Sequence, residues 1–258
     1  MLAMPNDSPQ KTLFVALVLC LVCSIAVASA SVLLRPLQER NKTLAMRTEI
    51  LRVAGLFEEG KDVNALFEQI EARVVDLETG EYVDHIDVVT YDHIEAARDP
   101  ELSVPVPRDD DIARIFTRAK YAPVFLVKDG DEVKTIILPV YGYGLWSTMY
   151  AFVALGPDGR TVEGVTFYQH GETPGLGAEV ENPKWQANWK GKVAIADDGR
   201  VQFQVNKGSV DPNSPEVEYA VDGLTGATLT SDGVTNLMQY WLGENGFGPY
   251  LAQIRAEQ

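Results

Sequence analysis

The range Asp222–Thr228, which reads Asp-Gly-Leu-Thr-Gly-Ala-Thr, holds the residues of this sequence best suited to chemistry. Together with the nearby Thr230, Thr225 and Thr228 supply more hydroxyl groups than a helix cap requires, and Gly226-Ala227 leaves the backbone amides open. Backbone amides at the start of a helix bind anions without any basic side chain. The loop therefore either only begins a helix or holds a phosphate at its positive end. Residue types alone favour the first interpretation, because short motifs give many false matches.

An amphipathic helix is expected after this range. Apolar residues recur at the spacing of one helix face, at Val234, Leu237, Met238, Trp241 and Leu242. Thr230 or Ser231 is a natural N-cap, and Asp232 suits the first turn. The pattern predicts a helix that begins at about Ser231 and buries this apolar face.

The range Gly142–Ser147, Gly-Tyr-Gly-Leu-Trp-Ser, opens like a dinucleotide-binding fingerprint. It lacks the third glycine, and strand-like residues follow it, so a nicotinamide-binding domain is not expected. The glycines instead indicate close backbone approach at the start of a strand. Trp146 then lies either in the core or beside a ligand.

The range His170–Gly177 contains three glycines and one proline. A structural turn is the favoured interpretation. Alternatively, the bare backbone could lie against a flat ring while Leu176 covers one face. His170, Glu172 and Glu179 could in principle bind a metal, but the whole chain has only three histidines. We expect a solvated histidine and no metal site.

Composition and charge narrow the class of protein. The chain has 258 residues, 46% of them hydrophobic and 23% charged, which is typical of a folded protein. The formal charge is −15, of which residues 1–42 contribute +2 and the remainder −17. A general nucleic-acid binder would show a basic face, so that function is not expected.

Thr12–Leu34 is an uncharged apolar run, followed by Arg35-Pro36. As a helix it would reach about 35 Å, enough to cross a bilayer core. A cleaved signal peptide is the alternative, since residues 28–30 resemble a cleavage site. We favour a retained single span, in which Cys20 and Cys23 are small lipid- or helix-facing residues. The basic residues after the span would place the C-terminal part in the cytoplasm.

Between this span and residue 121 the pattern is mixed. Residues 41–50 can continue as a helix, and residues 62–73 show helical spacing. Prolines and charges predict a loop over 98–110, and a helix over 112–116 would follow the acidic run Asp109–Asp111. From there, strands are expected at 124–127, 133–140, 148–155, 162–168 and 201–205. The fold class is α+β, an antiparallel sheet with flanking helices after one N-terminal transmembrane helix.

A family resemblance adds to these patterns. Asp222-x-x-Thr225-Gly226-Ala227-Thr228 resembles the flavinylation motif of bacterial membrane flavoproteins. The likeness extends through the N-terminal span, residues 73–77, 141–147 and 172–177. Essentially the whole chain resembles the C subunits of the sodium-translocating NADH:quinone reductases.

The resemblance implies a cofactor and its site. Thr228 would be the residue that a flavin transferase esterifies with the phosphate of FMN. Asp222 and Thr225 match motif positions that the transferase needs. The ring would lie near four residues of the two glycine-rich loops, Leu145, Trp146, Thr173 and Leu176. No residue of this chain is assigned as catalytic.

The resemblance also implies an assembly and a location. The chain would relay single electrons between an iron–sulfur centre and another subunit's flavin. Sodium transport and ubiquinone reduction would belong to the complex, in the bacterial inner membrane. The flavin domain would face the periplasm, against the count of basic residues. Rival hypotheses are the flavin subunit of an Rnf-type complex and an anchored, non-redox binding module.

The expected organisation has four parts. Residues 1–11 form a short tail, residues 12–34 the transmembrane helix, and residues 35–120 a membrane-proximal helical and mixed region. Residues 121–258 form the FMN-binding α+β domain.

Overall fold

The computed structural model describes residues 8–256, and the chain divides into two compact units, Met1–Met46 and Arg47–Gln258. The first unit consists of most of α1 (Pro9–Val53). The helix includes all of the predicted span and continues through Pro36, and large apolar side chains are exposed along it. By length and mean hydropathy it can cross a membrane. Residues 1–7 of the expected tail lie outside the described residues.

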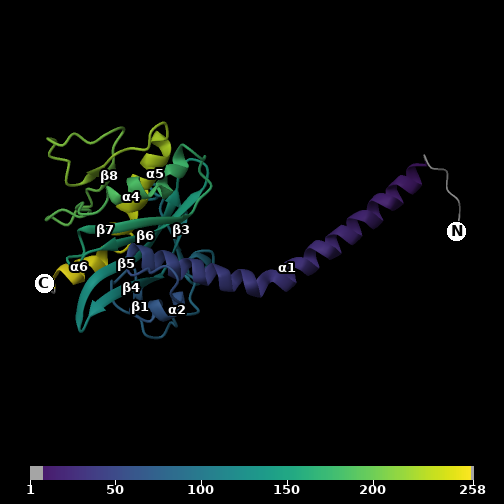
Figure 1. The fold of residues 1–258 in the computed structure, drawn as a ribbon, viewed down its shortest axis with the longest axis horizontal. Helices are drawn as coiled ribbons and strands as arrows, with labels where there is room; N and C mark the ends of the chain where they lie inside the picture. Colours follow the sequence, from purple (N-terminus) through teal and green to yellow (C-terminus); the bar gives the residue numbers. More distant parts are fainter. Residues whose placement is uncertain (1–7, 257–258) are drawn as a thin grey trace. The chain divides into compact units, whose positions relative to one another are not determined.

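The second unit contains a five-stranded antiparallel sheet of order β1-β4-β5-β6-β7 (Figure 1). Its strands are β1 (Ile70–Asp76), β4 (Tyr121–Asp129), β5 (Glu132–Tyr143), β6 (Thr148–Leu155) and β7 (Val162–Gln169). The four strands predicted between residues 124 and 168 are confirmed, and short turns join them as expected. The sheet takes its fifth strand, β1, from before residue 121.

Both faces of this sheet are buried. Along β5, Ile136 and Leu138 belong to one core cluster, whereas Ile137 belongs to another. Successive side chains of a strand point to opposite faces, so the two clusters cover the two faces. The first is closed by α5 (Thr228–Leu242), and the second by the end of α1 and by α2 (Val63–Phe67). Apolar side chains on both faces explain why these strands read as continuous apolar runs.

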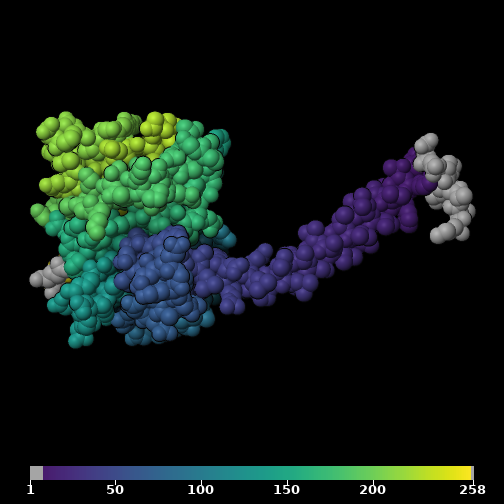
Figure 2. All heavy atoms as spheres, in the orientation of Figure 1, coloured from purple at the N-terminus to yellow at the C-terminus, as the bar shows by residue number. Residues whose placement is uncertain are grey.

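Shorter elements complete the second unit. They are α3 (His93–Ala96), β2 (Ser103–Pro105), β3 (Thr117–Ala119), the 3₁₀ helix η1 (Gly177–Glu181), α4 (Pro183–Ala187), β8 (Gln204–Val205), β9 (Ala220–Val221) and α6 (Gly248–Ala256). β2 pairs with β3 antiparallel, and β8 with β9 parallel. The segments from η1 to α5, green to yellow in Figure 2, gather on one side of this unit.

Several secondary-structure predictions are wrong. The loop expected over 98–110 contains the short strand β2. The helix expected over 62–73 is only α2, because residues from Ile70 onward pair with β4. The helix expected over 112–116 is absent, since the Asp111 carboxylate accepts the backbone N–H groups of Ile115 and Phe116 and closes a turn instead. The strand expected at 201–205 is reduced to β8.

The packing of α6 onto the turn after β1 yields a stability prediction. Gly80 and Gly130 both have a positive φ, +80° and +63°. A Cβ on Gly80 would lie 2.6 Å from the backbone carbon of Pro249, whereas one on Gly130 meets nothing within 4 Å. We expect Gly130→Ala to cost about 1–2 kcal/mol through backbone strain alone. Gly80→Ala should cost about 1–3 kcal/mol more, because of overpacking. Denaturant unfolding of both variants checks this, and equal losses would contradict the packing.

Candidate functional site

A buried carboxylate joins the two glycine-rich loops to the start of α5. Glu172 is only 5% exposed. Its carboxylate accepts the backbone N–H groups of Leu145 at 3.1 Å, Trp146 at 2.9 Å and Ser147 at 3.3 Å. It also accepts the Thr230 hydroxyl at 2.7 Å. The Glu172 side chain therefore connects to Ser147, 25 residues before it, and to Thr230, 58 residues after it.

The carboxylate of Glu172 is kept ionised by these donors. Burial by itself raises its pKa, but hydrogen bonds from Thr230 and from the backbone of residues 145–147 outweigh burial, and the net shift is downward. The site thus contains a fixed negative charge whose partners are neutral N–H and O–H groups.

Two glycines make this contact possible. A Cβ on Gly144 would lie 2.6 Å from Glu172 Oε1, and one on Gly177 would lie 2.5 Å from Thr230 Oγ1. Any larger residue would push the loops off the carboxylate. The close backbone approach that the glycines indicated is therefore directed at Glu172, a role that sequence reasoning missed.

The hydroxyl groups around the start of α5 divide into two kinds. Thr230 and Ser231 are buried inside the first turn, where the Ser231 hydroxyl accepts the N–H of Leu224 at 3.1 Å. Their predicted role as N-cap is wrong, because the helix begins at Thr228. Thr225 and Thr228 are exposed. Ala227 is the N-cap residue, and it provides no side-chain cap hydrogen bond.

Asp222 lies at the start of the loop that leads into α5, and two hydrogen bonds fix its position. Its carboxylate accepts the N–H of Val210 at 2.7 Å, and its backbone carbonyl accepts the indole N–H of Trp185 at 2.7 Å. Both contacts fix the path of the chain into α5. This geometry agrees with a role in loop shape.

Apolar side chains are exposed on these same segments. Trp146 is 65% exposed, and Leu145 and Leu176 are also exposed. A Cβ on Gly226 would lie 3.1 Å from Leu176 Cδ2, so Leu176 lies over the loop before α5. Thr173 is exposed, and its carbonyl accepts the N–H of Leu176 at 3.1 Å.

Leu229 is 58% exposed at the start of α5 and was not predicted. The sequence could have indicated Leu229, because this residue lies outside the apolar stripe of the helix. A leucine outside the stripe, one residue after Thr228, is unexplained by core packing.

His170 differs from its expected state. Its side chain is 7% exposed, not solvated, and its Nδ1 accepts the N–H of Glu172 at 3.1 Å. Its Nε2 lies 2.9 Å from a carboxylate oxygen of Glu181. The Glu172 carboxylate accepts hydrogen bonds from backbone amides and does not face His170 as a metal ligand would. Residues 8–256 contain no cluster of three or more His, Cys, Asp or Glu that could hold a metal ion.

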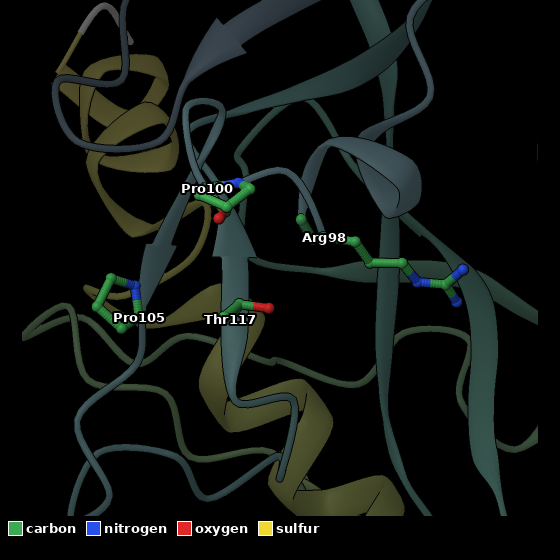
Figure 3. Close-up of a pocket in the computed structure, with 6 residues that line it drawn as sticks. Arg98, Pro100, Pro105 and Thr117 are labelled. Carbon is green, nitrogen blue, oxygen red and sulfur yellow. The ribbon is translucent and has the colours of Figure 1, made fainter.

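Two surface hollows can be located. One of about 210 Å³ is lined in part by Asp222, together with Val210 and Val221. The other, of about 280 Å³, lies at β2, β3 and the segment after α3 (Figure 3). Its lining residues are Ala97, Arg98, Pro100, Ser103, Pro105 and Thr117. None of them belongs to the predicted site, and the Arg98 side chain extends to one side of the hollow. Thr228 itself lies among exposed residues, Thr225, Gly226 and Leu229.

The fold and this arrangement define an FMN-binding domain, since residues 144–243 match the family model described as FMN-binding domain. The C subunit of the Na(+)-translocating NADH-quinone reductase from Pseudomonas aeruginosa is 52% identical over 97% of both chains. Its counterpart from Vibrio anguillarum is 48% identical over 98% of both. The chain belongs to the family of Na(+)-translocating NADH-quinone reductase C subunits.

A solved structure agrees with this assignment. The crystal structure of Shewanella oneidensis NqrC matches with a TM-score of 0.75 and 36% identity, over 82% of this chain and 96% of that chain. The predicted fold class, a helix-flanked antiparallel sheet after one apolar N-terminal helix, is confirmed.

The Glu172 contacts predict a specific loss on substitution. Glu172→Gln replaces one acceptor oxygen by an NH₂ group that faces other donors. We expect it to lower the free energy of unfolding by about 1.5–3 kcal/mol, the range for hydrogen bonds to charged groups. The exposed Glu163→Gln should change it by less than about 0.5 kcal/mol. Urea unfolding at pH 7 compares the two, and equal effects would contradict the role of Glu172.

The downward pKa shift adds a pH dependence. A lowered folded-state pKa stabilises the fold above the unfolded value, near 4.5, and this stabilisation is lost as pH falls through the folded value. The difference between the native protein and Glu172→Gln should therefore be full at pH 7 and shrink below pH 4.5.

Proposed function

We propose that Thr228 carries FMN as a phosphoester. The observation that supports it is the division of hydroxyls around α5. Thr230 donates to Glu172 and Ser231 accepts from Leu224, and both are buried. Only Thr225 and Thr228 offer an accessible hydroxyl on this stretch. Of these two, Thr228 is the first residue of the helix.

The start of α5 suits the phosphate of such an ester. A phosphoester of FMN retains one negative charge. The 15-residue helix directs its first backbone N–H groups and the positive end of its dipole toward this position. No side chain among residues 8–256 caps these groups, so they are available to an anion.

The neighbouring loops suit the isoalloxazine ring. We place it near Leu145, Trp146, Thr173 and Leu176, and add Leu229. Four of these are large exposed apolar residues on segments that Glu172 ties together. Their exposure is costly without a partner, and a flat aromatic ring would cover them.

FMN supplies redox chemistry, and this chain's residues retain and orient it. An ester at Thr228 prevents loss of the cofactor in every redox state, as an electron carrier in a membrane complex requires. The chain would then relay electrons between other subunits of the reductase. Identity of 52% over nearly the full length supports this complex over an Rnf-type one. A non-redox binding module would not explain the FMN-binding match.

Thr228→Ala tests the acceptor directly. When the full chain is produced together with a flavin transferase, the native protein should gain one FMN by intact mass. Thr228→Ala should gain none, because the acceptor oxygen is missing. Flavin fluorescence should survive denaturing electrophoresis only for the native chain.

Thr225→Ala distinguishes a residue that the transferase recognises from the residue that accepts the flavin. We expect it to reduce the modified fraction without moving the flavin. Thr230→Ala, which removes a donor to Glu172, should lower stability while leaving an acceptor in place. FMN on the Thr228→Ala protein would contradict the assignment.

We further propose that residues 12–34 span the inner membrane and that residues 121–258 carry the flavin on the periplasmic side. Cys20 and Cys23, both in α1, are replaced by serine, and one cysteine is placed at the exposed Val89. A membrane-impermeant maleimide should label it in cells whose outer membrane alone is permeabilised. Labelling only after inner-membrane lysis would support the cytoplasmic orientation indicated by the basic residues.

A further inference from the structure

An unusual backbone segment, Asp111–Phe116, lies beside the loop that carries Trp146. Within residues 8–256, Arg114 at φ 54° and Phe116 at φ 65° are the only non-glycine residues with positive φ. This conformation is rare for large side chains and is concentrated at functional sites, where surrounding contacts enforce it.

Identified contacts enforce the conformation here. The Asp111 carboxylate accepts the N–H groups of Ile115 and Phe116, each at 2.8 Å. The carbonyl of Phe116 accepts the N–H of Val106 at 2.9 Å. The backbone of Phe116 is thus held on both sides.

The outcome of this constraint is an aromatic ring in solvent. Phe116 is 75% exposed. Single exposed apolar residues are common and by themselves mean little. Here, however, identified contacts hold the backbone of Phe116 at positive φ and keep its ring in solvent.

The segment is also connected to the loop that carries Trp146. The Arg114 guanidinium donates to the carbonyl of Gly144 at 2.7 Å and lies 4.7 Å from the centroid of the Tyr143 ring. The N–H of Tyr143 in turn donates to the carbonyl of Ala113 at 2.8 Å. A partner bound at Phe116 would therefore contact a segment fixed to residues 143–144.

We propose that Phe116 is the anchor by which this chain docks onto another subunit of the reductase. The socket would be apolar, to bury the ring, and its rim would carry charges of both signs, because Arg108, Asp109 and Asp110 are all exposed just before this segment. The proposal rests on the chain being one subunit of a complex, and not on the flavin linkage at Thr228.

Photocrosslinking in the assembled complex tests this contact. Phe116 is replaced by p-benzoylphenylalanine, and Val89, 78% exposed on a different loop, is replaced in a matched control. The Phe116 position should give a covalent adduct with another subunit after irradiation, at least fivefold above the control. Adducts with lipid alone, or yields no greater than at Val89, would overturn the proposal.

Phe116→Gly separates docking from folding. Glycine adopts φ 65° without strain, so the Tm of the purified chain should be unchanged or higher. Loss of the ring should lower retention of this chain in the complex by about tenfold after a salt wash, and Phe116→Tyr should restore most of it. Full retention of Phe116→Gly would overturn the proposal, as would a fall in Tm that parallels the loss.

Discussion

The structure around α5 depends on one buried carboxylate. Glu172 accepts three backbone N–H groups and the Thr230 hydroxyl, so its charge is neutralised by oriented dipoles and not by a cation. A buried charge is tolerated only when such donors surround it. The two glycine-rich loops and the helix must therefore keep their relative positions, and Gly144 and Gly177 provide the space that this requires.

This constraint also separates the hydroxyl groups around the start of α5 by function. Thr230 and Ser231 serve the fold, and their burial leaves the start of α5 without a side-chain cap. In most helices a cap residue satisfies those N–H groups. In α5 those N–H groups lie at the exposed Thr228, and this arrangement suits a phosphate on that residue. Hydrogen bonds from Val210 and Trp185 to Asp222 fix the start of the same loop. The proposed phosphoester at Thr228 would use the first turn of α5, which no side chain of its N-cap residue closes.

Much of the fold could be predicted from local pattern. Four central strands were read correctly because burial of both faces makes them continuous apolar runs. The stripe of α5 was read correctly because burial of one helix face imposes a period on the sequence. Pairing between distant segments left no such signal: Ile70 begins a strand only because β4 is beside it. The role of Glu172 could not be predicted either, since it depends on donors 25 to 58 residues away. The proposed acceptor, Thr228, came from family resemblance, and the structure adds that Thr228 is exposed.

Site-specific mass spectrometry of the native chain from its own membranes tests the central claim most directly. Cleavage after Lys207 and Arg255 yields one peptide that contains both Thr225 and Thr228. The account predicts one FMN on this peptide, with fragment ions that place it on Thr228. Fragment ions that place FMN on Thr225, or a peptide without FMN from membranes that hold the assembled reductase, would contradict it.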